Sequence, residues 1–227
     1  MGTPVPREMC HACMRPRASC LCPAKPPMAT RTRIVLLMHP KEHRHVKCNT
    51  GRLTHLNLAN SEIIAGLRFD DHPRVRALID DPANLAMLLY PGKDALLLGP
   101  DVFPEPARAR RRLVVFLIDA TWHDARAIAR LNPGLLALPR LAIEPRTPSR
   151  YTIKHQPAPW CLSTLEATHE LLLALEAAGL DEYPDKGRLI AAFDTMQEYQ
   201  VRQTAARRSV RTLHRVRGPR QPRGAAP

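Results

Sequence analysis

The sequence lacks long hydrophobic runs, and this absence argues against a protein with membrane-spanning helices. No apolar stretch approaches the roughly 18 residues that a membrane-spanning helix requires. The first residues, MGTPVPREMCHAC, also lack the apolar core of a secretory signal peptide. We therefore expect a cytoplasmic protein, in which cysteines act more commonly as thiols or metal ligands than as disulfides.

Acidic residues are also scarce, above all near the end of the chain. The 227 residues include 34 Lys and Arg but only 21 Asp and Glu, which gives a formal net charge of +13. Eight arginines and no acidic residue fall between Arg202 and Arg223. Such a segment can be a solvated tail whose arginines reflect genome composition. Its attachment to a basic globule favours a polyanionic partner instead, most commonly nucleic acid.

Four of the six cysteines are concentrated near the start of the chain. Cys10 and Cys13 form a C-x2-C pair, and Cys20 and Cys22 follow as a C-x-C pair. Together they supply the four soft ligands of a closed, structural zinc site, in a segment with almost no core-forming side chains. The alternatives are a redox pair, chance clustering, or a site in which His11 replaces one cysteine. Cys48 and Cys161 are isolated in sequence, and we do not expect them to be ligands.

The stretch from Arg111 to Pro133 indicates a strand followed by a helix. Residues 113–118 are apolar and rich in β-branched side chains, as in a strand buried on both faces. Apolar positions recur at helical spacing from Trp122, and Asn132-Pro133-Gly134 ends that pattern. Asp119-Ala-Thr-Trp122 therefore lies at the carboxyl end of a strand, where open α/β sheets bind ligands. Alternatively, Asp119 or Thr121 caps the helix and Trp122 anchors it in the core.

The rest of the chain predicts an α/β domain. Residues 33–38 form a strand that ends in a polar loop, 39–45. His39, His43 and His45 of this loop, with Cys48 after it, offer a second metal site that is less favoured because basic residues lie among them. The long segment 144–161 is too polar to be a simple connector. Ser163-Thr-Leu-Glu166 predicts a capping box that opens a helix ending near Gly179. The other expected elements are strands at 85–90, at 95–98 and at 135–143 with a break at Pro139, and helices at 53–67 and from 186 toward 214.

Five motifs in series resemble one family. They are the CxxC…CxC knuckle, HPKE with NTGRL after it, Asp-Ala-Thr-Trp, SRYTIKHQP and LSTLEA, in this order between Cys10 and Tyr199. The chain resembles a DTW-domain protein of the bacterial tRNA-uridine aminocarboxypropyltransferase type. The resemblance implies a SPOUT-like, mostly parallel sheet flanked by helices with a deep trefoil knot, beside the small zinc knuckle. It also implies transfer of the 3-amino-3-carboxypropyl group of S-adenosylmethionine to N3 of a uridine in the tRNA variable loop, with release of 5′-methylthioadenosine.

The resemblance also implies roles for particular residues. Asp119 becomes the candidate general base, or a group that binds the donor's amino group or orients the uracil. Because a free Asp titrates near ~3.9, it is a weak base unless burial raises its pKa. Thr121 and Trp122 complete the catalytic motif. The residues expected to bind the donor are Leu138, Pro139, Ser149, Tyr151, Gln156, Ser163, Thr164 and Glu166. Those expected to bind tRNA are His39, Lys41, Arg52, Arg150 and Lys154. On charge alone we add Arg207, Arg208 and Arg211 of the basic tail, which is not part of the family pattern.

We accordingly divide the chain into a zinc knuckle with its linker (1–27), a catalytic domain (28–201) and a basic tail (202–227). A SPOUT-type RNA methyltransferase is the alternative within enzymes. A non-catalytic, zinc-containing RNA-binding module is the alternative outside them. Asp119 distinguishes the last, because a pure binder has no need of a carboxylate that faces a polyanion.

Overall fold

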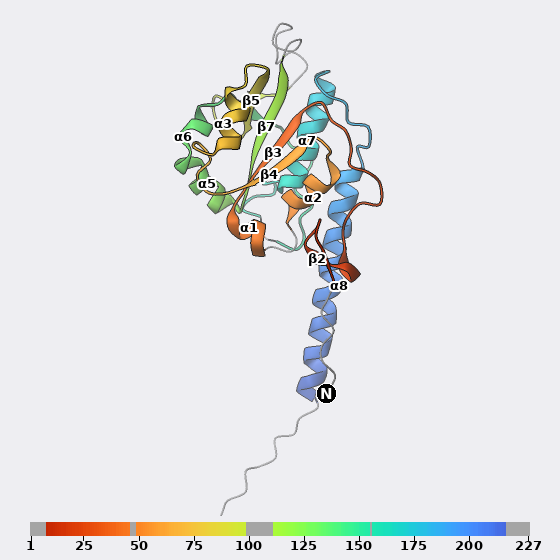
Figure 1. Cartoon of the computed structure of the whole chain (residues 1–227). Helices are drawn as coiled ribbons and strands as arrows, with labels where there is room; N and C mark the ends of the chain where they lie inside the picture. Colours follow the sequence, from red (N-terminus) through yellow and green to blue (C-terminus); the bar gives the residue numbers. More distant parts are fainter. Residues whose placement is uncertain (1–7, 46–48, 99–110, 155, 217–227) are drawn as a thin grey trace, which may run out of the picture.

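A six-stranded parallel sheet lies at the centre of the protein (Figure 1). The structure is a computed structural model that describes residues 8–45, 49–98, 111–154 and 156–216, with His45 and residues 207–216 as backbone only. The strands occur in the order β4-β3-β7-β5-β8-β6. Their bounds are β3 Arg33–Met38, β4 Ser61–Ala65, β5 Asn84–Leu89, β6 Leu96–Leu97, β7 Arg112–Asp119 and β8 Arg140–Ala142. The expected mostly parallel α/β architecture is confirmed.

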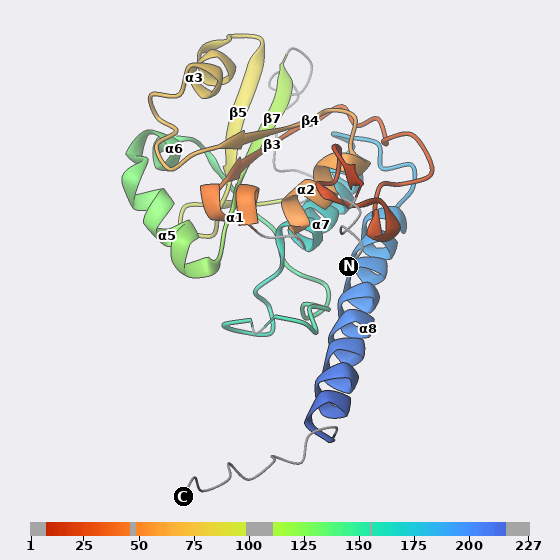
Figure 2. The same ribbon diagram turned by 60° about the horizontal axis from the view of Figure 1, so that its bottom comes forward.

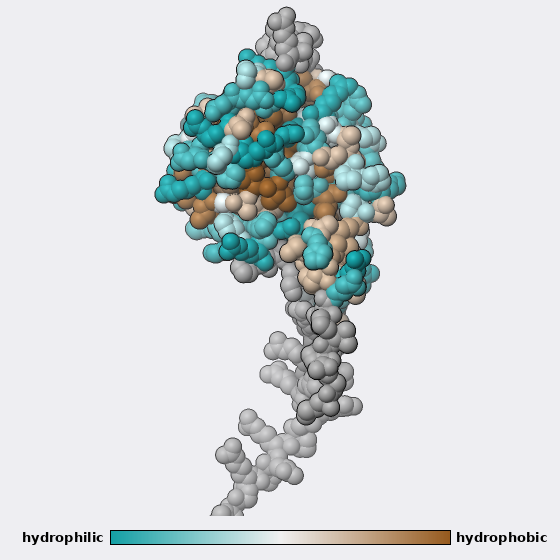
Figure 3. All heavy atoms as spheres, viewed as in Figure 1, coloured by the Kyte–Doolittle hydropathy of each residue, from teal (hydrophilic) through white to brown (hydrophobic). Residues whose placement is uncertain are grey.

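Helices cover both faces of the sheet. Successive side chains of a strand point to opposite faces, and in the central strands they are apolar on both, so each face needs a covering layer. Ile34 and Leu36 pack against α2 (Thr50–Asn57), α7 (Thr164–Ala177) and α8 (Arg188–Val216). Val35 and Leu37 pack on the other face against α3 (Pro73–Asp80), α5 (Trp122–Leu131) and α6 (Pro133–Ala137). In β7, Val115 and Leu117 join the first of these cores and Val114 and Phe116 the second, so the prediction that strand 113–118 is buried on both faces is confirmed. Figure 3 shows hydrophilic residues around the rim of one face, with hydrophobic ones near its middle, where Figure 1 places β4.

Two predictions about the first half of the chain are wrong. Segment 39–45 is not a loop, because Pro40 opens a short helix, α1 (Pro40–His45). The helix expected at 53–67 is instead α2 followed by the strand β4. Asn57 donates its side-chain amide to the carbonyl oxygen of Leu53 at 2.8 Å, and Leu58 is extended, so the helix ends there. The β-branched Ile63 and Ile64 then pair with β3 as an edge strand.

The strand expected at 135–143 is also wrong over its first half. Residues Pro133–Ala137 form α6, and only Arg140–Ala142 form the strand β8. The cause is a distant side chain that the local pattern does not contain. The carboxylate of Asp70 accepts hydrogen bonds from the backbone N–H groups of Gly134 and Leu135 at 2.7 and 3.0 Å, which caps the short helix.

The later helices agree with the sequence. Ser163 and Glu166 form the predicted capping box at the start of α7, and Gly179 follows the helix with a φ of +69°. The helix α8 extends away from the sheet in Figures 1 and 2. The short strands β1 (Met9–Cys10) and β2 (Arg15–Pro16) and the 3-10 helix η1 (Arg17–Ser19) build the cysteine knuckle. Among the described residues, no helix combines the length and the apolarity needed to cross a membrane.

Candidate active site

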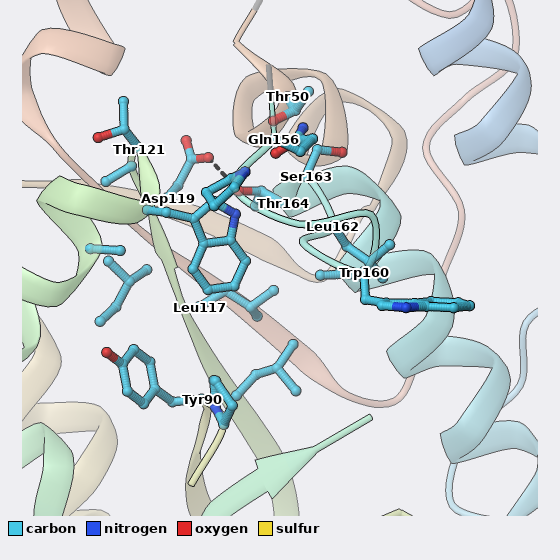
Figure 4. A pocket seen from close by; sticks show the side chains of 18 of the residues that line it. Thr50, Tyr90, Leu117, Asp119, Thr121, Gln156, Trp160, Leu162, Ser163 and Thr164 are labelled. Carbon is cyan, nitrogen blue, oxygen red and sulfur yellow. Dashed lines mark hydrogen bonds between the residues drawn. The ribbon is translucent and has the colours of Figure 1, made fainter. Parts of the chain in front are cut away.

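A pocket of about 500 Å³ opens at the carboxyl ends of β5, β7 and β8 (Figure 4). This size is typical of a small-molecule site. Apolar side chains make up most of the lining, and polar groups gather at one end, around Asp119. The walls come from the strand ends, the starts of α5 and α7, and the long loop 144–161, which hangs below the sheet between α5 and α8 in Figure 2.

Asp119 is the last residue of β7, and its side chain is buried beside the pocket. Thr164 donates its hydroxyl to Oδ1 of Asp119 at 2.6 Å, and Asn49 donates its amide to Oδ2 at 3.2 Å. Burial raises the pKa of Asp119 to about 6, and the negative charge of Glu42 adds to this effect. The hydrogen bonds from Thr164 and Asn49 oppose it. A carboxyl group with this pKa can accept a proton near neutral pH.

A second carboxylate lies at the same end of the pocket. Glu42 of α1 lines it and accepts a hydrogen bond from the same Asn49 amide nitrogen at 3.3 Å. The end of β3 places α1 here, since Met38 pairs with Asp119 and the backbone N–H of His39 donates to the carbonyl of Asp119 at 3.0 Å. The sequence analysis missed Glu42 and Asn49. Glu42 is the last residue of the HPKE motif and Asn49 is the first of NTGRL, so these two motifs could have indicated both residues.

The other two residues of the motif have separate roles. Thr121 caps α5, because its hydroxyl accepts a hydrogen bond from the backbone N–H of Asp124 at 3.2 Å. The capping alternative is therefore confirmed for Thr121, whereas Asp119 points to Asn49 and Thr164 instead. Trp122 lines the pocket and belongs to neither hydrophobic core. Trp160, which the sequence analysis did not single out, also lines the pocket and is 55% exposed.

The residues expected to bind the donor fall into two groups. Four of them line the pocket: Tyr151, Gln156, Ser163 and Thr164. Four others are absent from its lining: Leu138, Pro139, Ser149 and Glu166. The carboxylate of Glu166 accepts hydrogen bonds from the backbone N–H of Ser163 and Arg150 and from the hydroxyl of Ser149, so it joins the long loop to the start of α7.

The long loop is fastened to α8 as well as to α7. Gln197 accepts a hydrogen bond from the backbone N–H of Thr152 at 2.7 Å and donates one to the carbonyl of Arg150 at 3.1 Å. The guanidinium of Arg150 pairs with Asp194 at 2.8 Å. The ring of Tyr151 meets Phe193 edge to face at 5.1 Å. The final helix thus holds the wall of the pocket in place.

The residues expected to bind tRNA are dispersed around this end of the molecule. Lys154 lines the pocket, with its ammonium 5.7 Å from the ring centre of Tyr151. His39, Lys41 and Arg52 lie at the starts of α1 and α2, outside the pocket lining. Arg150 is exposed and paired with Asp194, as described above. The side chains of Arg207, Arg208 and Arg211 lie outside the described part of the chain, as do those of His45 and Cys48 in the second metal site.

The four knuckle cysteines converge on one point. Their sulfur atoms lie within 4.8 Å of one another, with 3.6 Å between Cys10 and Cys22 and 3.6 Å between Cys13 and Cys20. Zn–S bonds of about 2.3 Å at a tetrahedral angle place sulfur atoms about 3.8 Å apart, so the set fits a zinc ion. Backbone N–H groups of Cys13 and Ala12 lower the pKa of the Cys10 thiol to about 6, whereas burial raises the pKa of the Cys22 thiol, so the fit to a metal rests on the sulfur geometry. The cluster could therefore hold a metal.

The knuckle also contacts the last helix. The guanidinium of Arg15 lies 4.6 Å from the ring centre of Tyr199 in α8, and its Nε donates to the carbonyl of Ser19 at 2.8 Å. At the start of α8, the guanidinium of Arg188 donates hydrogen bonds to the carbonyls of Lys25 and Pro26 in the linker, at 2.7 Å each.

Comparison with known proteins places the chain in a family. The sequence model of the DTW domain matches residues 7–201, so the chain belongs to the DTW domain family, as the motifs predicted. It is 32% identical over 203 residues to tRNA-uridine aminocarboxypropyltransferase 2 of Drosophila melanogaster, covering 86% of this chain and 76% of that protein. It is 28% identical over 222 residues to tRNA-uridine aminocarboxypropyltransferase A of Arabidopsis thaliana, covering 86% and 81%.

The mouse relative, also named tRNA-uridine aminocarboxypropyltransferase 2, is 31% identical over 174 residues. That match covers 75% of this chain but only 57% of the mouse protein. No solved structure shows a significant match to the chain.

Proposed function

We propose that the protein is a tRNA-uridine aminocarboxypropyltransferase. It transfers the 3-amino-3-carboxypropyl group of S-adenosylmethionine to N3 of a uridine in the variable loop of tRNA. The observation that carries this proposal is the buried carboxyl group of Asp119, with a pKa of about 6, beside a pocket of about 500 Å³ in a DTW domain. The names of the relatives support the same reaction.

The reaction is an in-line displacement at the carbon that links sulfur to the amino-acid arm. Uridine N3 loses its proton to Asp119 and attacks this carbon, so that an N–C bond forms while the S–C bond breaks. The sulfonium leaves as neutral 5′-methylthioadenosine, and the electron pair of the broken bond stays on sulfur. Because the leaving group needs no protonation, positioning and removal of the N3 proton supply most of the rate.

The pocket offers matching surfaces for the two reactants. Trp122 and Tyr151 provide aromatic area for the adenine of the donor or for the uracil. The start of α7, with Ser163 and Thr164 in the lining, provides backbone N–H groups and the positive end of a helix dipole for the donor's carboxylate. Gln156 adds an amide at the same end. We assign Ser149 and Glu166 to the support of this wall, whereas Leu138 and Pro139 join α6 to β8 on the other side of the pocket floor, with Leu138 packed against the second core.

In this proposal, basic residues near the pocket and in the arginine-rich end of the chain bind the tRNA backbone. They are His39, Lys41, Arg52, Arg150, Lys154, Arg207, Arg208 and Arg211. Contacts between arginine or lysine and phosphates raise affinity without reading the base. We further propose that the protein acts in the cytoplasm, that its domain carries the SPOUT-like trefoil knot, and that the knuckle holds one structural zinc ion.

The test is product analysis with purified protein, S-adenosylmethionine and unmodified tRNA. The expected products are 5′-methylthioadenosine and a tRNA heavier by one aminocarboxypropyl group on uridine. Asp119→Asn should bind the donor almost as well but lose about 10²- to 10⁴-fold in kcat. Asp80→Asn, which neutralises an exposed carboxylate of α3, is the matched control.

Two outcomes would contradict the proposal. Formation of S-adenosylhomocysteine and a methylated base would identify a methyltransferase. Binding of tRNA without any turnover of the donor would identify a binding module. Full activity of Asp119→Asn would leave the reaction in place but remove the role of Asp119.

A further inference from the structure

Asn49 joins the two carboxylates of the pocket through one amide group. Its Nδ2 atom lies 3.2 Å from Oδ2 of Asp119 and 3.3 Å from Oε2 of Glu42. Its Oδ1 atom accepts the backbone N–H of Arg52 at 2.6 Å and caps α2. Since a backbone N–H can only donate, the amide oxygen must face Arg52, and the nitrogen must face the carboxylates. The amide nitrogen thus lies between the two carboxylates, and the backbone carbonyl oxygen of Glu42 is a third, longer acceptor at 3.5 Å.

Glu42 is a nearly buried carboxylate beside the pocket. Its exposed fraction is 9%, and those of Asn49 and Asp119 are 6% and 4%. Among the described residues, Glu42 has no cationic partner, and Asn49 is the side chain that bonds to it. A buried carboxylate without a cation destabilises a fold, whereas Gln at this position would fill similar space without the charge. The first turn of α1 favours a negative charge at this position, and it is the bond to Asn49 and the place beside the pocket that point to function.

The groups that face Asp119 come from four elements. Glu42 of α1 adds negative charge, and Lys154 of the long loop adds positive charge. Asn49, before α2, and Thr164 of α7 donate hydrogen bonds. Because the pKa of Asp119 rises with the charge of Glu42 and falls with the other three contacts, Glu42 is the neighbour that strengthens Asp119 as a proton acceptor.

We propose that Glu42 is a positioning residue for the transfer reaction, acting on Asp119 through Asn49 and through its own negative charge. It holds the Asn49 amide against Oδ2 of Asp119, which fixes the orientation of that carboxylate beside the pocket, and it keeps Asp119 a competent base for the N3 proton. This inference rests on the proposed function, in which Asp119 takes that proton.

The experiment compares Glu42→Gln, Glu42→Asp and Asn49→Ser with the wild type in the product assay across pH. Glu42→Gln should lower kcat roughly tenfold to a hundredfold while the KM and the dissociation constant of S-adenosylmethionine stay within about twofold. Loss of the negative charge lowers the pKa of Asp119, so the acid limb of kcat should move to lower pH. Glu42→Asp should restore part of kcat. Glu198→Gln, an exposed residue of α8, is the control.

Asn49→Ser separates the bridge from the cap. A serine still caps α2 but cannot donate to both carboxylates, so the helix content should persist while kcat falls. Unchanged kcat in both Glu42→Gln and Asn49→Ser, or a lower kcat with an unmoved acid limb, would overturn the inference.

A second readout does not depend on turnover. Carbon-13 NMR of aspartate-labelled protein follows the titration of Asp119, with Asp119→Asn as the assignment control. The signal should titrate at lower pH in Glu42→Gln than in the wild type, and an unmoved titration would contradict the coupling. Wild-type protein that makes no 5′-methylthioadenosine would refute the proposed function, whereas the NMR result tests the coupling of Glu42 to Asp119 in either case.

Discussion

Gly51 approaches the carboxylate of Asp119 so closely that a residue with a side chain fits at position 51 only if Asp119 moves. A Cβ atom on Gly51 would lie 2.2 Å from Oδ2 and 2.5 Å from Cγ of Asp119. Gly51 belongs to the first turn of α2, so the start of this helix is packed directly against the carboxylate. Its lack of a side chain provides the space that the Asp119 carboxylate occupies.

Replacing Gly51 by alanine should therefore displace Asp119. Alanine favours a helix over glycine by about 1 kcal/mol, so the thermal midpoint should change little while kcat falls at least tenfold. Gly187→Ala is the matched control, since a Cβ there meets no atom within 4 Å. Activity assays and thermal melts of both variants make the comparison, and full activity of Gly51→Ala would show that the close approach is not required.

Asp119 should make stability depend on pH. Its pKa in the folded protein is raised to about 6, above an ordinary value of 3.8. The folded state thus holds this proton more tightly than the unfolded chain, and the stabilisation is complete below the unfolded pKa and lost as pH rises through about 6. A difference of 2.2 units (6 minus 3.8) corresponds to about 3 kcal/mol.

Urea unfolding between pH 4 and pH 7.5 measures this effect. The wild type should lose up to about 3 kcal/mol relative to Asp119→Asn across this range, because the variant has no carboxyl group to titrate. Asp80→Asn should follow the wild type. Parallel pH profiles for the wild type and Asp119→Asn would mean that Asp119 titrates normally.

The cysteine cluster should bind one zinc ion per chain. Cys20→Ser removes one of four ligands and should lower both the metal content and the melting temperature, since the knuckle has little core of its own. Cys161→Ser, outside the cluster, should leave both unchanged. Elemental analysis and thermal melts with and without a chelator give the result. Purified protein without zinc, or Cys20→Ser with normal metal content, would remove the assignment.

The arginine-rich end should add affinity for tRNA without selecting the base. Deleting residues 203–227 should weaken tRNA binding and flatten its salt dependence, because fewer phosphates are neutralised. The residues of α8 that hold the long loop end at Gln197, so turnover at saturating tRNA should be largely retained. Filter binding at several salt concentrations and kcat measurements test this. A truncated chain that fails to fold would show that this part of α8 is structural.

The sequence was most informative where local rules decide the structure. Buried strands such as 33–38 and 113–118 and the capping box at Ser163 were predicted close to their observed bounds. The prediction of a helix at 53–67 was wrong because Asn57 ends α2 through a side-chain hydrogen bond, which the spacing of hydrophobic residues does not reveal. The strand 135–143 failed because its cap, Asp70, lies far away in sequence.

The site was predicted in part for the same reason. Asp119 stood out because it ends a hydrophobic strand abruptly. Glu42 lies in a segment in which most residues are charged or titratable, so the sequence does not single it out. The pairing of β3 with β7 brings it to Asp119. Sequence separation hides such a partner, since Asn49 and Asp119 are 70 residues apart.

The position of α8 in the chain determines when the site can be completed. Phe193, Asp194 and Gln197 fasten the wall of the pocket, and Tyr199 meets the cysteine knuckle. All four are translated after every residue of the pocket. On the ribosome, the sheet can form first, but the wall of the pocket and the cysteine knuckle gain their common support only when α8 has left the exit tunnel. The wall of the pocket is therefore fastened only after every strand of the sheet has been translated.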